Sequence, residues 1–341
     1  MEENRENIPI KPENTQSGDQ QEDCGCSNGS GSEQKLDCCG EAHPPSKAHG
    51  DFSDPVYKEI ALTNGTINQM SKDELRAKCA ELKLDTRGVK DVLNKRLKNY
   101  YKKQKLKQAA AGAPADTYYD YICVVDFEAT CEENNPSDFV HEIIEFPVVL
   151  IDTHTLEMVD YFQEYVKPEL NPQLSDFCVE LTGITQEMVD EADTFPKVFR
   201  RVVSWLQKKE LGTKYKYALL TDGSWDMSKF LYTQCRLSRI RYPQFARKWI
   251  NIRKSYGNYY KVARNQTKLN CMLENLGMHY EGRPHCGLDD SRNIARIAIR
   301  MLKDGCQLRV NEHMHGNELQ SVPINAPFEG APPPQKPKSR D

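Results

Sequence analysis

The chain has 341 residues, a formal net charge of −4 and 38% hydrophobic residues. It has no apolar run near the roughly 18 residues that a membrane span needs, so we expect no membrane partner. Twelve cysteines behind a polar, acidic start ("MEENRENIPI") favour reduced thiols of a cytoplasmic or nuclear protein over a secreted disulfide scaffold.

Charge is distributed unevenly along the chain. Residues 1–60 hold 13 acidic and 5 basic residues, whereas residues 72–107 hold 13 basic and 5 acidic ones. Because residues 1–65 are rich in Glu, Ser, Gly and Gln and poor in aromatics, we predict a disordered acidic tail there. Its cysteines lack the paired C-x-x-C spacing of a zinc ribbon and are interpreted as thiols without a metal: Cys24, Cys26, Cys38 and Cys39.

Two short helices are predicted next, in residues 66–107. Ser71 with Glu74 three positions later forms a capping box, and a second helix begins near Val89 with Leu93 and Leu97 on its apolar stripe. The other faces of the second helix are basic, with Lys90, Lys95, Arg96, Lys98, Lys102 and Lys103. A basic helix pair of this kind is typical of a small nucleic-acid-binding unit.

An α/β domain is predicted from residue 118 to residue 315, after a small-residue linker at 108–117. The stretches "YYDYICVVDFEATC", "EIIEFPVVLID", "MVDYFQEYVKP" and "YALLTDG" indicate strands, with Ile122, Val124 and Val125 in the core. The stretches "WDMSKFLYTQCRL" and "LDDSRNIARIAIRMLKDG" indicate helices. Residues 316–341 form a Pro-rich segment that we expect to be flexible.

Two carboxylates follow the first of these strands. Asp126 and Glu128 lie two residues apart, so in an extended chain they emerge on one face. Like charges so close repel each other unless a cation lies between them, and carboxylate oxygens are ligands that Mg²⁺ prefers. A solvated strand end is the alternative, and for an isolated D-x-E it would be the more common explanation.

Further acids follow other apolar elements and favour the metal site. Asp222 and Asp226 lie where "YALLT" passes into a helix, and "HCGLDD" places His285 in a loop with Asp290 at a helix start. Asp290 alone would also suit a helix N-terminus, and His285 alone would be ordinary surface decoration. The order D-x-E, D, then H-x4-D beside apolar elements is much harder to explain by chance.

This pattern resembles the DEDDh exonucleases, which are ribonuclease H-like 3′–5′ exonucleases. The resemblance spans Ser71 to about Glu312, with no departure in the catalytic motifs. It implies an α/β fold with a ribonuclease H-like mixed sheet flanked by helices, forming an exonuclease domain at 118–315. It also implies that the helical unit at 66–107 is a SAP domain.

The resemblance assigns roles to the conspicuous residues. Two Mg²⁺ ions would be held by Asp126, Glu128, Asp226 and Asp290. His285 would be the general base, since a histidine is mostly neutral at physiological pH. Glu128 would also face the terminal ribose. The nucleotide would be bound by Glu128, Phe127, Ala129, Trp225 and His285, with Trp225 stacking on the base unless it is packed in the core.

The resemblance also implies the substrates. They are RNAs with structured 3′ ends: the histone mRNA stem-loop, small-interfering-RNA duplexes with short overhangs, and the 3′ end of 5.8S ribosomal RNA. The products would be nucleoside 5′-monophosphates. Ribosomal RNA and a histone-mRNA-bound protein would be partners, in the cytoplasm and nucleus, with the nucleolus as a further location. Contacts with RNA are predicted at Lys90, Lys95, Arg96, Lys98, Lys102, Arg253 and Lys254.

Three alternatives remain at this stage. The acids are shared with DNA exonucleases, and no motif reads a 2′-hydroxyl. A non-catalytic RNA-binding adaptor would be recognised by a missing metal ligand, and none is missing here. A third alternative places DNA at the helix pair and makes nuclease activity secondary.

The segment "NIRKSYGNYYK" at 251–261 either guides RNA or is an exposed charged loop.

Overall fold

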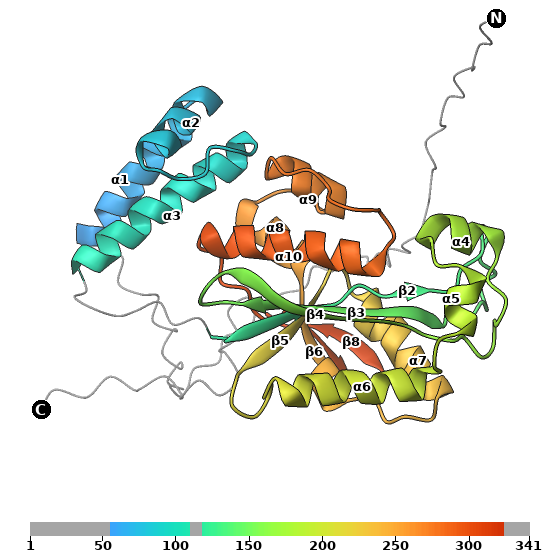
Figure 1. The fold of residues 1–341 in the computed structure, drawn as a ribbon. Helices are drawn as coiled ribbons and strands as arrows, with labels where there is room; N and C mark the ends of the chain where they lie inside the picture. Colours follow the sequence, from blue (N-terminus) through green and yellow to red (C-terminus); the bar gives the residue numbers. More distant parts are fainter. Residues whose placement is uncertain (1–54, 110–117, 324–341) are drawn as a thin grey trace, which may run out of the picture. The chain divides into compact units, whose positions relative to one another are not determined.

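A computed structural model describes residues 55–109 and 118–323 of the chain (Figure 1). Most of the predicted acidic tail, most of the predicted linker and the last 18 residues of the predicted C-terminal tail lie outside the described residues. Among the helices that the structure describes, none is long and apolar enough to cross a membrane.

The first described segment is a three-helix unit: α1 (Pro55–Gln69), α2 (Lys72–Glu81) and α3 (Lys90–Ala109). The predicted capping box is confirmed, because Ser71 N donates to the Glu74 carboxylate at 2.7 Å and Glu74 N donates to Ser71 Oγ at 3.3 Å. The buried side chains that join the three helices are Ile67, Leu75, Cys79, Leu93 and Leu97.

Helix α1 corrects the prediction that residues up to 65 are unstructured. Residues 55–65 are helical, and Ile60 and Ile67 are 8% and 2% exposed. Two isoleucines seven residues apart lie on one helix face, and that face packs against α3. This apolar stripe has too few residues to be distinguished from the polar residues around it, so the helix could not be predicted from composition.

Eight strands form one mixed sheet between residues 118 and 323, in the order β2-β3-β1-β5-β6-β7-β8, with β4 also paired to β3. Strands β1, β5 and β6 run parallel, and the other pairs are antiparallel. The strands are β1 (Tyr121–Val124), β2 (Glu128–Ala129), β3 (Ile143–Asp152), β4 (Glu157–Tyr165), β5 (Tyr217–Thr221), β6 (Lys248–Asn251), β7 (Glu312–His315) and β8 (Glu318–Ser321).

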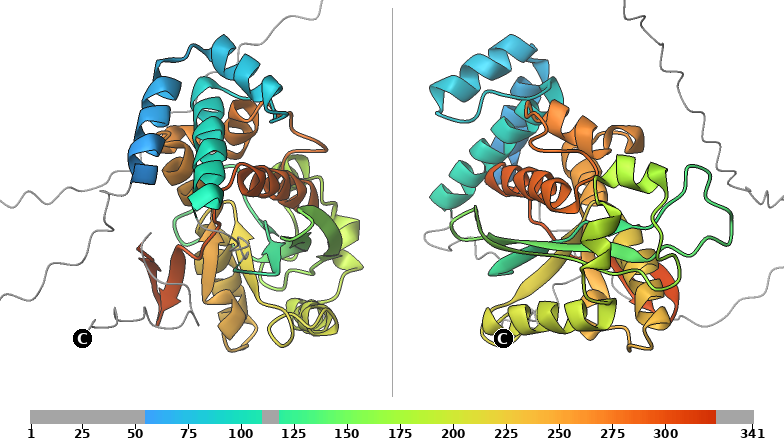
Figure 2. Two further views of the ribbon diagram at one scale, coloured as in Figure 1. Left: turned by 90° about the vertical axis from the view of Figure 1, so that its left-hand side faces the viewer. Right: turned by 45° about the vertical axis from the view of Figure 1, so that its right-hand side comes forward.

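Helices cover both faces of the sheet, which Figures 1 and 2 show from three sides. One core cluster joins the sheet to α8, α9 and α10, and the other joins it to α6, η1 and α7. The larger elements are α4 (Asp176–Thr182), α5 (Gln186–Asp190), α6 (Phe195–Lys208), η1 (Asp226–Leu231), α7 (Tyr232–Leu237), α8 (Ile252–Tyr260), α9 (Leu269–Asn275) and α10 (Gly287–Lys303). The short turns are η2 (Gln244–Ala246) and η3 (Arg264–Gln266). The predicted α/β class with a mixed sheet flanked by helices is confirmed.

The structure excludes one of the alternatives for the segment at 251–261 and corrects one predicted boundary. The segment at 251–261 is mostly the helix α8 rather than an exposed loop, with Tyr256 and Tyr260 buried at 0% and 2% exposure. The predicted flexible C-terminal segment begins too early, because β8 pairs with β7 over residues 312–321. All four residues of β8 are exposed, so the strand lacks the alternation by which it could have been recognised.

Candidate active site

The first two candidate acids lie just beyond the carboxyl end of β1. Ile122, Val124 and Val125 are 0–2% exposed, which confirms that this strand is buried. The chain then leaves the sheet at Asp126 and rejoins it at Glu128, the first residue of β2. Both acids are partly exposed. Their neighbours in the sheet are buried and paired, which places the two carboxylates at the same edge.

Asp226 reaches the same edge from the parallel strand β5. Because β1 and β5 are parallel neighbours, their carboxyl ends meet. Asp226 opens η1, a single turn of π-helix, a local geometry that often occurs at functional sites. It is 5% exposed, and its Oδ1 accepts a hydrogen bond from Phe127 N at 3.0 Å, which ties it to the segment between Asp126 and Glu128.

Asp290 and His285 come from the start of α10. Asp290 is 7% exposed and accepts hydrogen bonds from Tyr280 Oη at 2.7 Å and from His285 N at 2.9 Å. His285 is exposed and has a φ of 62°, a left-handed conformation that is uncommon outside glycine. Such backbone conformations cluster at functional sites, and here the hydrogen bond from His285 N links this residue to Asp290.

The four acids share one electrostatic environment. Burial first, and then the charges of Asp226 and Asp222, raise the pKa of Asp126 well above its ordinary range. Burial and the charge of Asp290 do the same to the pKa of Glu128. Burial raises the pKa of Asp226 to about 7, and burial also raises the pKa of Asp290. A cation bound between the carboxylates would relieve this mutual repulsion.

The donor set therefore fits a hard divalent cation. As the side chains stand, no group of three or more His, Cys, Asp or Glu residues between 55 and 323, where described, is arranged to hold a metal ion. Instead, carboxylate oxygens of Asp226 and Asp290 accept the hydrogen bonds described above. Four carboxylates at one sheet edge are still the oxygen ligands that Mg²⁺ selects. Residues that could hold it are Asp126, Glu128, Asp226 and Asp290.

Asp222 and Arg253 also belong to this edge. The guanidinium of Arg253 pairs with Asp222 Oδ2, with Nε at 2.9 Å. Asp222 Oδ1 is buried without a hydrogen-bond partner, and its charge acts on Asp126 and Asp226. The sequence placed Asp222 after the strand but assigned it no role. It placed Arg253 among the RNA contacts rather than at the acids, because their pairing brings together residues 31 positions apart.

The predicted nucleotide-binding residues differ in exposure. Trp225 is 59% exposed, so the alternative of a core tryptophan is wrong, and Lys229 Nζ lies 4.0 Å from its ring centroid. Ala129 is half-buried. Phe127 is 5% exposed and its ring packs edge-on against Phe146, so only its backbone borders the acids.

The basic residues predicted to contact RNA also differ in exposure. Lys90 and Lys102 are exposed on α3. Lys95 lies over the Tyr259 ring and Lys98 bonds to Asn68, so both are already engaged. Arg96 is 3% exposed and binds the Asp304 carboxylate through Nε at 2.7 Å and Nη2 at 2.9 Å. On α8, Lys254 forms an ion pair with Glu312 at 2.8 Å.

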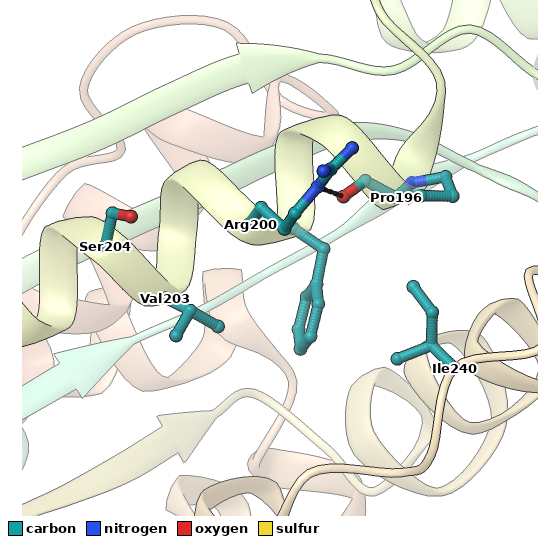
Figure 3. A pocket seen from close by; sticks show the side chains of 6 residues that line it. Pro196, Arg200, Val203, Ser204 and Ile240 are labelled. Carbon is teal, nitrogen blue, oxygen red and sulfur yellow. Dashed lines mark hydrogen bonds between the residues drawn. The ribbon is translucent and has the colours of Figure 1, made fainter.

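A separate apolar groove lies along α6. Figure 3 shows Pro196, Val203 and Ile240 around it, with Arg200 donating to the Pro196 carbonyl at 3.2 Å. The groove is lined by Pro196, Phe199, Arg200, Val203, Ser204 and Ile240. It contains none of the predicted catalytic or metal-binding residues, so the candidate active site is the carboxylate edge and not this hollow.

Comparison with known proteins agrees with this geometry. A family model described as an exonuclease (RNase_T) matches residues 123–298, and a SAP domain model matches residues 66–102. The human protein named 3′–5′ exoribonuclease 1 is 72% identical over 290 residues, which cover 85% of this chain and 83% of that protein.

Solved structures give the same result. One, described as 3′-end specific recognition of histone mRNA stem-loop by 3′-exonuclease, is 72% identical with a TM-score of 0.63 and covers 84% of this chain and 98% of its own. Another, the nuclease domain of a DEDDh family member bound to rAMP, is 74% identical with a TM-score of 0.58, covering 59% of this chain and 100% of its own.

The fold and the acids at its edge define an exonuclease of the DEDDh class, and the chain is an enzyme. It belongs to the family of the 3′–5′ exoribonucleases 1, with a SAP domain ahead of the exonuclease domain.

Proposed function

We propose that this enzyme trims the 3′ ends of structured RNAs by Mg²⁺-dependent hydrolysis and releases nucleoside 5′-monophosphates. The observation that carries the proposal is the group of Asp126, Glu128, Asp226 and Asp290, whose pKa values are raised together at one sheet edge beside His285. All the residues of the D-x-E, D and H-x4-D pattern meet there, which favours a catalytic protein over an RNA-binding adaptor.

The proposed mechanism assigns a task to each residue, and Glu128 has two. Two Mg²⁺ ions held by the four carboxylates would stabilise the attacking and leaving oxygens of an in-line displacement. His285, exposed at the rim, takes the proton of the attacking water. Glu128 also accepts from the terminal ribose, and Trp225 stacks on the terminal base. Burial of Asp226 and Asp290 keeps water away from their carboxylates and fixes their orientation.

The proposed substrates are RNAs whose 3′ end follows a stem. The relative described as recognising the histone mRNA stem-loop supports a histone mRNA substrate. By the same family resemblance we propose small-interfering-RNA overhangs and the 3′ end of 5.8S ribosomal RNA, with a histone-mRNA-bound protein as partner. The exposed Lys90 and Lys102 on α3 would contact phosphates without reading sequence.

The decisive variant is Asp126→Asn, which removes a charge from the acid group while keeping the side-chain shape. We expect Mg²⁺-dependent trimming of a stem-loop RNA to fall at least about 100-fold, since the change removes a proposed metal ligand. Binding of the same RNA, measured by fluorescence anisotropy, should persist, because α3 is untouched. Full residual trimming would refute the assignment of the site.

A timed digest separates the alternatives. Stem-loop, overhang-duplex and single-stranded RNAs, each with a matched DNA, are incubated with Mg²⁺ or with a chelator, and the 3′ end of every product is read. We expect RNA to be degraded in steps of one nucleotide, only with metal. Preferred degradation of DNA would favour the DNA exonuclease, and the absence of any hydrolysis would favour the adaptor.

The phosphate contacts have their own test. Replacing Lys90 and Lys102 together by alanine should weaken binding of all RNA sequences alike and reduce the slope of log affinity against log salt by roughly 1–2, because each phosphate contact contributes about 0.7–0.9. The matched control is Lys197→Ala and Lys214→Ala, two exposed lysines of the exonuclease domain. An unchanged slope would remove α3 from the RNA-binding surface.

We also propose a location in the cytoplasm and the nucleus, with the nucleolus as a further site. The support is the basic run "KKQKLK" at 102–107, which suits nuclear import but equally extends α3. Imaging of the tagged full chain tests this, and strict exclusion from the nucleus would refute it.

A further inference from the structure

Glu145 is a buried carboxylate that the mechanism above does not use. It lies on β3, paired in register with Glu128 of β2, and is 1% exposed. Its oxygens accept three hydrogen bonds: from Gly287 N at 2.9 Å, from Leu288 N at 3.2 Å and from Gln163 Nε2 at 2.7 Å. Two of the three donors are thus the first two backbone N–H groups of α10.

Glu145 caps these two N–H groups from another element of the fold. The first four N–H groups of a helix lack partners within it, and a side chain just before the helix usually satisfies one of them. In α10 the residue before the helix is Cys286, whose side chain forms no capping bond. Glu145, 142 residues away along the chain, takes over that role, and its negative charge suits the positive end of a 17-residue helix.

The start of α10 is also closely packed against the active site. A Cβ on Gly287 would lie 2.7 Å from the backbone oxygen of Asp126 and 3.0 Å from Glu145 Oε2, so the helix start is pressed against the segment that carries the first acid. His285 lies two residues before Gly287, and Asp290 lies three residues after it. A shift of the turn would move both relative to Asp126.

We propose that Glu145 is a positioning residue of the hydrolytic site. By holding the first turn of α10 against the end of β1, it fixes the distance of His285 and Asp290 from Asp126 and Glu128. The inference rests on the proposed function of these four residues. It extends that function to a residue that would contact neither metal nor RNA.

A carboxylate suits position 145 because the three groups that form hydrogen bonds with it are all donors. Two oxygens serve two backbone N–H groups and one side-chain amide. A glutamine there keeps the size but turns an NH₂ group toward at least one of these donors, and it loses the charge at the helix end. The first turn must then move or lose a bond.

The chain supplies a matched control in Glu142. It is 2% exposed and accepts three backbone N–H bonds, from Glu169 at 2.7 Å, Leu170 at 2.8 Å and Asn171 at 2.7 Å. Its loop carries none of the proposed catalytic residues. Glu142→Gln therefore reproduces the cost of disturbing a buried, triply bonded carboxylate without moving α10.

The test compares Glu145→Gln with Glu142→Gln in the full chain. For Glu145→Gln we expect kcat on a stem-loop RNA to fall about 10- to 100-fold with KM little changed, as is usual when a group that orients metal ligands is removed. The Mg²⁺ concentration for half-maximal rate should rise, and the increase in Tm on adding Mg²⁺ should shrink. Glu142→Gln should lower Tm similarly but leave kcat and the Mg²⁺ response unchanged.

Gly287→Ala approaches the same contact from the other side and keeps the inference testable if Glu145→Gln does not fold. Its new methyl must push the helix start away from Asp126, so the same kinetic and Tm signatures are expected. If Glu145→Gln behaves like Glu142→Gln, or if folded Gly287→Ala keeps the normal kcat and Mg²⁺ response, the inference is wrong. Loss of activity in Asp126→Asn at the same time would leave the proposed function standing, whereas full activity there would overturn the function itself.

Discussion

At the scale of single residues, the site holds acids that resist ionisation while no cation is bound. Asp226 illustrates this: burial raises its pKa from 3.8 to about 7, although the Phe127 N–H bond opposes the shift. Between these two pH values the folded chain keeps a proton that the unfolded chain has released. Raising the pH through this window therefore favours unfolding, by up to about 1.4 kcal/mol per pH unit.

This gives a prediction for the metal-free protein. In chelator, Tm should fall between pH 5 and pH 7 more steeply than in Asp226→Asn, because asparagine cannot ionise but still accepts from Phe127 N. Added Mg²⁺ should raise Tm more at pH 7.5 than at pH 5.5, since it replaces protons on the carboxylates. Thermal unfolding by circular dichroism measures both, and equal pH slopes in the two proteins would contradict the linkage.

At the scale of elements, the turn η1 places two neighbouring residues in opposite environments. Asp226 is 5% exposed, and Trp225 beside it is 59% exposed. The Trp225 ring is steadied by Lys229 at 4.0 Å and by the edge of Phe230, whose ring centroid is 6.2 Å away. An exposed, supported ring beside the proposed metal site is suited to stacking on a base.

Trp225→Ala should therefore weaken binding of the RNA 3′ end by about 1–3 kcal/mol, roughly 5- to 150-fold, for every terminal base alike. Trp225→Phe should recover part of the loss. Because the side chain is exposed, Tm should change little. Leu62→Ala, at a 75% exposed position on α1, is the control for removing surface apolar area. Equal RNA affinity of Trp225→Ala and the unchanged chain, by anisotropy, would exclude stacking.

The sequence predicted those parts of the site that depend on local pattern. Asp126, Glu128 and Asp226 follow strands whose apolar runs are plain, so the edge where they meet could be inferred. Glu145 could not be recognised, because its partners Gly287 and Leu288 are more than 140 residues away. Within "EIIEFPVVL" it appears as one more polar residue of a strand. Local pattern reveals elements, whereas caps contributed by another element need the fold.

At the scale of the whole molecule, a buried ion pair joins the SAP domain to the exonuclease domain. Arg96 on α3 binds the Asp304 carboxylate just after α10, and also donates to the carbonyls of Asp85 and Arg87 at 2.6 Å and 2.8 Å. Tyr260 Oη donates to the same carboxylate at 2.8 Å. From the sequence, Arg96 was predicted to be an exposed basic residue that contacts RNA. Its contact with Asp304 spans 208 residues and leaves no local pattern that could have revealed it.

Arg96→Ala should lower the free energy of unfolding by about 3–5 kcal/mol, because it leaves Asp304 buried without its countercharge. Replacing both partners, as Arg96→Met with Asp304→Leu, should recover most of the loss. Arg76→Ala, in the exposed pair with Asp73, should change stability by less than about 1 kcal/mol. Urea unfolding distinguishes these outcomes, and equal effects of the two arginine changes would show that the buried pair is unimportant.

The burial of the Asp304 carboxylate beneath Arg96 has a consequence for shortened forms of the chain. Its side chain is 2% exposed while Arg96 covers it, and a carboxylate that meets water needs no arginine. Removing the whole three-helix unit at 55–109 would expose Asp304 to water, whereas removing the Arg96 side chain alone would leave the carboxylate buried without its countercharge. The loss of more than fifty residues should therefore be milder for the exonuclease domain than the loss of one guanidinium, in keeping with a relative's nuclease domain having been solved by itself.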